Sequence, residues 1–327
     1  MTRCVSRQVS QPSHVEVHMA KVSSLAQVLD RLRVTVLADL DSQGFVVPQE
    51  SAADVEEVVL AAFRLKSRSI IPRIRAVRWS RELKARTLES RVADALQMIA
   101  EESEQGLDLN PRLTRKYFRA GFNDPFLNDL GLQHLHLGAP SGGKNGQAGG
   151  TRELLFTLVG PDELLFVDVR DHDGFKQDDL VRLVYRNWPE YLEPYRVHGV
   201  VGLERPVSAA ERVTLRESNI AVPIEIDGSV FWPPGGGTTT AGTGTMAVRS
   251  KISFMKRIRG GHSWLVENAD RIAEHIRDHA RVSIDVLDVE VVPQEGGPVF
   301  REITTGAVID PSSGTVALPT AQEPPGV

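Results

Sequence analysis

Two histidines separated by one leucine, His134 and His136, are the residues of this sequence best suited to proton-transfer chemistry. Between Leu132 and Leu137, leucine alternates with glutamine or histidine, and this period of two predicts a β-strand. Residues two apart on a strand project from the same face, about 7 Å apart. The pair could therefore act as base and acid in a hydrolytic reaction, or it could be two surface histidines on a polar strand face.

Two further candidate residues flank a predicted hairpin. Its strands are the apolar runs Glu153–Val159 and Glu163–Val169, joined at Gly160-Pro161-Asp162. Arg152 stands before the first run, and His172 follows the second. Cleavage of a ribonucleotide without metal needs a base for the 2′-hydroxyl, an acid for the leaving oxygen and a cation for the phosphate. We expect Arg152 to supply the cation and His172 further proton transfer, with a purely structural Arg152 as the alternative.

The first hypothesis is thus a metal-independent endoribonuclease without a cofactor, whose catalytic residues are His134, His136, Arg152 and His172. A second hypothesis is a metal-dependent phosphohydrolase or nuclease, because imidazole and carboxylate groups also bind divalent metal ions. Its ligands would be His134, His136, Asp168, His172 and Asp173. The dipeptide His172-Asp173 resembles that of the HD phosphohydrolases, although there it lies in a helical bundle and here it follows a strand. Alternatively, the run Asp-His-Asp-Gly forms only a polar turn, for which its composition is typical.

A basic segment from Arg64 to Arg86 is the candidate nucleic-acid contact. It carries nine Lys or Arg residues against one acid, Glu82, in a chain whose formal net charge is -5. Cations at this density hold phosphates, and an aromatic ring among them can stack a base. The candidate nucleic-acid-binding residues are Arg73, Arg75, Arg78, Trp79 and Arg81. The alternative is a solvated face of neighbouring helices.

The elements around these residues predict an α+β fold, with a helical N-terminal part, a central antiparallel sheet with flanking helices and a smaller C-terminal α+β unit. Apolar residues at helical spacing predict helices over 24–40, 51–66, 80–102, 111–119, 178–186 and 263–280, the second capped by Ser51. Glycine-rich stretches predict loops over 139–150 and 233–244. Asp227-Gly228 predicts a type I′ turn in a hairpin over 222–231, and further strands are expected over 282–292 and 298–303.

These patterns divide the chain into five parts: a disordered lead-in at 1–20, a helical region at 21–120, the central sheet at 121–205, the C-terminal unit at 206–309 and a flexible tail at 310–327. The single cysteine, Cys4, excludes intramolecular disulfides and a cysteine-based zinc site, which favours a reducing compartment. No apolar run approaches the roughly 18 residues that span a bilayer, and the first 20 residues lack the core of a signal peptide. We therefore expect a cytoplasmic protein without a membrane partner.

The order of elements over residues 86–187, about a third of the chain, resembles the RelE/ParE toxins and, more broadly, the ribonucleases of the barnase and colicin type. The resemblance rests on a strand and a tight hairpin after helices, at Gln133–Leu137, Thr151–Phe156 and Leu165–Val169. It implies cleavage of an RNA substrate, a toxin or phage-defence role and a neutralising antitoxin protein as partner. This chain is much longer than a typical member. A third hypothesis is a non-enzymatic module, in which the second unit binds a protein and the helical part binds nucleic acid or forms a homo-oligomer. It would be favoured if His134, His136 and His172 lay far apart or were buried in contacts with backbone groups.

Overall fold

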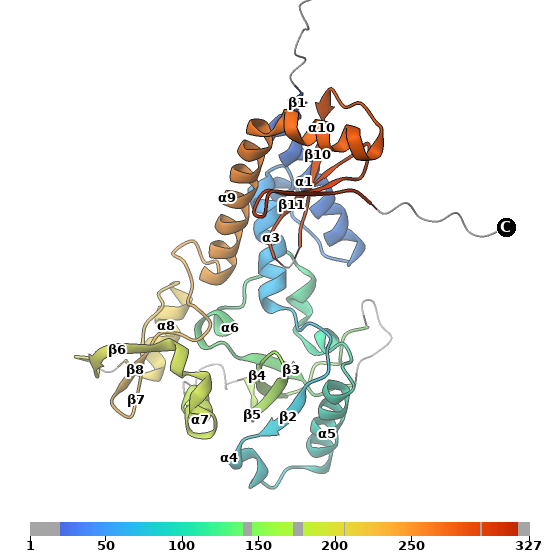
Figure 1. Ribbon diagram of the computed structural model, residues 1–327. Coiled ribbons are helices and arrows are strands. Elements are labelled where there is room, and N and C mark those ends of the chain that lie inside the picture. Colours follow the sequence, from blue (N-terminus) through green and yellow to red (C-terminus); the bar gives the residue numbers. More distant parts are fainter. Residues whose placement is uncertain (1–19, 140–145, 173–178, 206, 295, 320–327) are drawn as a thin grey trace, which may run out of the picture. The chain divides into compact units, whose positions relative to one another are not determined.

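The computed structural model describes residues 20–139, 146–172, 179–205, 207–294 and 296–319 (Figure 1). Its helices and several sheets confirm the predicted α+β class. The chain forms two compact units: the smaller takes its described residues from 1–32 and 256–327, and the larger covers 33–255. The domain boundaries predicted at 120 and 205 both fall inside the larger unit. No helix in the described ranges is both long enough and apolar enough to cross a membrane.

A four-stranded sheet forms the core of the larger unit, in the order β2-β5-β4-β3. Its strands are β2 (Ala76–Trp79), β3 (Gln133–His136), β4 (Glu153–Val159) and β5 (Glu163–Asp171). The antiparallel pairing predicted for β3, β4 and β5 is confirmed. The edge strand β2 pairs in parallel with β5, so the sheet is mixed rather than wholly antiparallel. The alternation of basic and apolar residues over 73–79 is the sequence signal for this additional strand.

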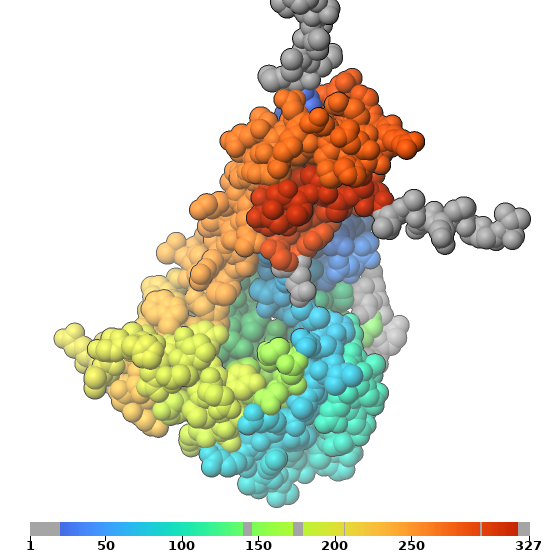
Figure 2. All heavy atoms as spheres, viewed as in Figure 1, coloured from blue at the N-terminus to red at the C-terminus, as the bar shows by residue number. Residues whose placement is uncertain are grey.

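Helices pack on both faces of this sheet. One face contributes Leu155 and other buried residues to a cluster with α5 (Ser90–Glu104). The other side of α5 is exposed to solvent and is visible in turquoise in Figure 2. The opposite face contributes Phe156 to a second cluster with α6 (Pro125–Leu130) and α7 (Asp179–Asn187), the helix predicted at 178–186. Because side chains alternate across a strand, the residues of β3 and β4 are divided between these two clusters.

The helix predicted from Ser51 is interrupted. It is replaced by α2 (Gln49–Ala52) and α3 (Val55–Arg68). Asp54, rather than Ser51, caps α3, because its carboxylate accepts a hydrogen bond from the Glu56 amide at 2.7 Å.

The next two predicted helices are also divided. In place of one helix over 80–102, α4 (Arg81–Lys84) ends before α5 begins. The segment 111–119 forms two short 3-10 turns, η1 (Asn110–Arg112) and η2 (Arg115–Phe118). The residue that follows η1 has an extended backbone, with ψ at 168°, and this prevents a continuous helix.

A three-stranded sheet in the order β6-β8-β7 also belongs to the larger unit. Its strands are β6 (Arg196–Val201), β7 (Ile224–Ile226) and β8 (Ser229–Phe231). The predicted hairpin is confirmed, since Asp227 and Gly228 have φ angles of 50° and 74°. Two positive φ angles are what a type I′ turn requires.

The smaller unit holds an antiparallel sheet in the order β10-β11-β12-β13. Its strands are β10 (Val289–Val292), β11 (Val299–Glu302), β12 (Val308–Asp310) and β13 (Thr315–Ala317). The pairing of β12 with β13 shows that the prediction of a flexible tail from residue 310 is wrong over 310–317. Residues 320–327, and all but the last residue of the predicted lead-in, lie outside the described ranges.

The remaining elements largely follow the predictions. The helix expected at 24–40 is α1 (Leu25–Ser42). The helix expected at 263–280 comprises the end of α9 (Thr245–Glu267) and all of α10 (Ala269–Ala280). Before β10, the short strand β9 (Val286–Leu287) pairs in parallel with β1 (Lys21–Val22).

Candidate active site

A cavity of about 670 Å³ in the larger unit is lined by three of the four predicted catalytic residues, His134, His136 and His172. The ring centroids of His134 and His136 are 6.4 Å apart, and those of His136 and His172 are 6.5 Å apart. Charged and aromatic side chains complete much of the wall, namely Arg115, Lys116, Phe122, Asp124, Phe126, Arg216 and Glu217.

The strand pairing explains how the histidines meet. On β3, His134 and His136 lie opposite Phe156 and Leu154 of β4 and share one face of the sheet, as the alternation predicts. His172 directly follows β5, which is separated from β3 by β4. Two of the histidines lie on a strand of this sheet and the third directly follows another strand. The hydrogen-bonded sheet therefore sets the spacing of the three histidines.

The face that carries the histidine pair is largely apolar, in contrast to the alternative of a polar surface. His134 is only 8% exposed, and its ring lies 6.5 Å from that of Phe156. Phe126 of α6 packs against Phe156, with ring centroids 5.4 Å apart. Asp124, the N-cap of α6, places Oδ2 3.8 Å from Nδ1 of His134. The two histidines therefore occupy a hydrophobic floor with one carboxylate beside it.

Burial keeps the histidines of β3 neutral at neutral pH. It lowers the pKa of His134, and the opposing effect of Asp124 is smaller. Burial also lowers the pKa of His136 to about 4, with further contributions from His134, His172 and Arg115. A neutral imidazole has one nitrogen that can accept a proton, so His136 is in the protonation state that a general base needs.

The lowered pKa of His136 predicts a pH-dependent stability. Between pH 6.5 and about 4, the unfolded chain binds a proton at His136 that the folded chain does not bind. The contribution of this residue is therefore fully present above pH 6.5 and is lost as the pH falls towards 4. When the pH falls from 7 to 4.5, the free energy of unfolding should decrease by about 1–3 kcal/mol less in His136→Gln than in the natural chain. Urea unfolding at both pH values measures this difference. Equal losses in the two proteins would contradict the burial of this imidazole.

A backbone contact orients His172. Its Nδ1 lies 3.2 Å from the carbonyl oxygen of Arg152. Because a carbonyl oxygen only accepts hydrogen bonds, Nδ1 carries the proton in this contact. The ring is exposed and can exchange protons with solvent.

The side chain of Arg152 does not line the cavity, which departs from its predicted role as the phosphate-binding cation. It is 83% exposed, and its guanidinium lies 4.0 Å from Oδ2 of Asp171. Arg115 and Lys116, on η2, line the cavity instead. The sequence signal for these cations is the presence of three basic residues within 115–119. This run lies in the segment 111–119, which helical spacing predicts to be one helix.

Asp168, one of the proposed metal ligands, is engaged in two ion pairs. Asp168 is 6% exposed; its Oδ1 accepts a hydrogen bond from Arg86 at 2.8 Å and its Oδ2 accepts one from Arg170 at 2.6 Å. A carboxylate held in this way is committed to the two guanidinium groups. Asp173, another proposed ligand, lies outside the described residues. Within the ranges described, no group of three or more His, Cys, Asp or Glu side chains is placed to hold a metal ion.

The five predicted nucleic-acid-binding residues lie outside the cavity and make contacts within the protein. Arg73 pairs with Asp162 at 2.6 Å. Arg75 is 5% exposed and donates to the carbonyl oxygen of Gly160 at 2.9 Å. Arg81 donates to side-chain and backbone oxygens at the end of α7. These side chains stabilise the edge of the sheet around β2.

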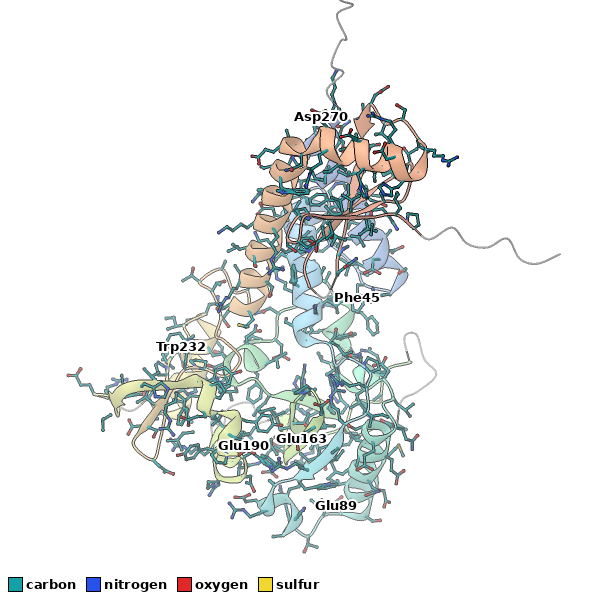
Figure 3. All side chains as sticks on the ribbon, viewed as in Figure 1. Phe45, Glu89, Glu163, Glu190, Trp232 and Asp270 are labelled. Carbon is teal, nitrogen blue, oxygen red and sulfur yellow. The ribbon has the colours of Figure 1, made fainter. Side chains whose placement is uncertain are left out.

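The other two members of this set are also engaged. Arg78 lies 3.0 Å from Oε2 of Glu163 and 3.8 Å from Oε1 of Glu190, and these two acids lie near each other in Figure 3. The ring of Trp79 packs against Phe166, with centroids 4.8 Å apart. Three cations of the basic segment, Arg73, Arg78 and Arg86, thus pair with acids that follow it in the chain.

The candidate site therefore combines a buried and a half-buried histidine from β3, a third histidine after β5 and two cations from η2. The three histidines line one cavity and so do not lie far apart, although His172, which is exposed, does contact a backbone carbonyl group. Comparisons with family models, with curated proteins and with solved structures found no significant match to this chain.

Proposed function

We propose that this cavity is the active site of a metal-independent endoribonuclease. One observation carries the proposal. The ring of His136, neutral through burial, has its centroid 6.5 Å from that of His172, in a cavity that is also lined by Arg115 and Lys116. Two imidazoles at this separation can both approach one reacting phosphate. Cations beside them can stabilise the negative charge that develops on that phosphate.

In the proposed reaction, His136 accepts the proton of the 2′-hydroxyl, whose oxygen attacks the adjacent phosphorus. The bond from phosphorus to the 5′-oxygen breaks, and Nε2 of His172 in its protonated form gives that oxygen a proton. The products are a 2′,3′-cyclic phosphate and a 5′-hydroxyl. Arg115 and Lys116 bind the phosphate oxygens through the reaction. Asp124 and the apolar floor hold His134 in place behind this pair.

A biological setting follows from the resemblance to ribonuclease toxins. We propose a toxin or phage-defence role in the cytoplasm, with a neutralising protein that covers the cavity. Such a partner would block access to His172, which is exposed in the isolated chain.

The proposed chemistry can be tested by cleavage of single-stranded RNA in the presence of EDTA. We expect cleavage at the same rate as without EDTA and a 2′,3′-cyclic phosphate end. An oligonucleotide with one ribonucleotide in a DNA strand should be cut only after that residue, because the attacking hydroxyl exists only there. Activity that EDTA abolishes and Mg²⁺ or Mn²⁺ restores would favour the metal-dependent alternative. No cleavage of any RNA would refute the proposal.

A further inference from the structure

A second cavity, of about 590 Å³ and here called the groove, adjoins the candidate active site. It shares Lys116 and Phe122 with the histidine cavity, and its other lining residues are Val46, Pro48, Arg119 and Gly121. Both cavities belong to the larger unit. Because they share two lining residues, the two cavities are adjacent.

The cations that line the histidine cavity and the groove on the segment 115–119 are available to a ligand. Arg115, Lys116 and Arg119 are exposed, and their side chains make no ion pair or hydrogen bond with any residue that the structure describes. By contrast, Arg73 and Arg78 of the basic segment are paired with acids. Exposed cations without acidic neighbours attract a chain of phosphates more strongly than cations already in ion pairs.

An aromatic ring stands between the two cavities. Phe122 is half-buried and contributes to both walls. Nζ of Lys116 lies 5.9 Å from the centroid of this ring. Val46, which is 69% exposed, adds apolar surface on the far side. A ring with a neighbouring cation and adjacent apolar surface is the arrangement that stacks an unpaired base while a cation holds its phosphate.

The wall that carries these groups is preorganised. Arg68, which is 4% exposed, donates hydrogen bonds to the carbonyl oxygens of Tyr117, Arg119 and Phe122 at 2.8 to 2.9 Å. Phe45, labelled in Figure 3, packs against the ring of Tyr117 with centroids 5.2 Å apart. One buried guanidinium thus supports the backbone of the segment that carries Arg119 and Phe122, which lowers the entropy lost when a ligand binds.

We propose that this groove is a subsite for the nucleotide next to the scissile bond, so that the substrate is a single-stranded RNA rather than a mononucleotide or a duplex. The base of that nucleotide stacks on Phe122, and its phosphate lies between Lys116 and Arg119. A paired base cannot expose the face that stacking needs. This inference rests on the proposed function, since it takes the scissile phosphate to lie among the histidines.

Binding can be measured separately from cleavage in a His136→Ala background, by fluorescence anisotropy with a short labelled single-stranded RNA. We expect Phe122→Leu to weaken binding by about 5- to 100-fold. Arg119→Gln, at a cation that lines only the second cavity, should also weaken binding and should reduce the salt dependence by roughly one ion. Arg249→Gln is the matched control, because Arg249 is an exposed cation of α9 in the same unit and lines neither cavity. Circular dichroism of each variant verifies its fold.

The outcomes separate this inference from the proposed function. If the natural chain cleaves RNA but Phe122→Leu and Arg119→Gln bind and cleave it as the Arg249→Gln control does, the groove is not a subsite, although the nuclease proposal stands. If these substitutions weaken RNA binding while no RNA is cleaved, the groove binds RNA and the proposed function fails. Binding of duplex RNA as tightly as single-stranded RNA, or no binding of either, would overturn the stacked-base subsite.

Discussion

His136→Ala should lower kcat for RNA cleavage by roughly 10²- to 10⁴-fold and leave KM nearly unchanged, because a general base acts in the transition state and contributes little to binding. The burial that lowers its pKa to about 4 keeps this imidazole unprotonated at neutral pH. Steady-state kinetics on a single-stranded RNA with defined ends measures the effect. His198→Ala is the control, since His198 is exposed on β6 in the same unit and does not line the cavity.

His172→Ala should cause a loss of similar size, because it removes the proposed acid. Arg152→Ala is the informative contrast. The sequence alone predicts loss of activity in this variant, whereas the structure predicts a nearly normal rate, since the side chain is 83% exposed and the carbonyl oxygen that holds His172 remains. Normal cleavage by both His136→Ala and His172→Ala, with the control unaffected, would remove these residues from the mechanism.

Arg112→Met should destabilise the fold by about 3–5 kcal/mol, because it leaves a carboxylate and two carbonyl groups without their partner. The side chain of Arg112 is fully buried and forms two hydrogen bonds with Glu102, at 2.6 and 2.7 Å. It also donates to the carbonyl oxygens of His136 and Gly138. One guanidinium thus connects α5, η1 and the end of β3. Urea unfolding followed by circular dichroism should show the loss as a lower midpoint.

Two further variants identify the cause of this loss. Arg112→Met combined with Glu102→Leu should recover part of the stability, because a buried ion pair replaced as a whole costs less than one with a single partner removed. Arg91→Ala removes an exposed pair with Glu153 and should cost at most about 1 kcal/mol. If Arg112→Met and Arg91→Ala unfold at the same urea concentration, the buried network does not stabilise β3.

Local patterns were sufficient for the strands around the site and for one hairpin. The alternation over 132–137 predicts both the strand and the shared face of His134 and His136. The pair Asp227-Gly228 predicts its turn, because these residue types adopt the positive φ angles that the turn needs. Period and turn chemistry depend on neighbouring residues, so the sequence by itself determines them.

Helix boundaries and the role of the basic segment depended on more distant residues. The number of basic residues between Arg64 and Arg86 can be read from the sequence, but the acids that pair with these residues cannot. Arg73 and Arg78 are paired with Asp162 and Glu163, which are 89 and 85 residues further along the chain. The parallel pairing of β2 with β5 brings these residues together, so that two of the candidate nucleic-acid-binding cations form ion pairs at the sheet edge.

The chemical state of the candidate site was decided in the same way. The sequence by itself determined that two histidines share a strand face and that a third follows the hairpin. Only the tertiary structure decided that Phe126 and Phe156 cover that face, that the pKa of His136 falls to about 4, and that cations from η2 rather than Arg152 line the cavity. The reason is physical: periodicity is a property of adjacent residues, whereas burial, ion pairing and pKa depend on groups that the fold brings together from distant parts of the chain.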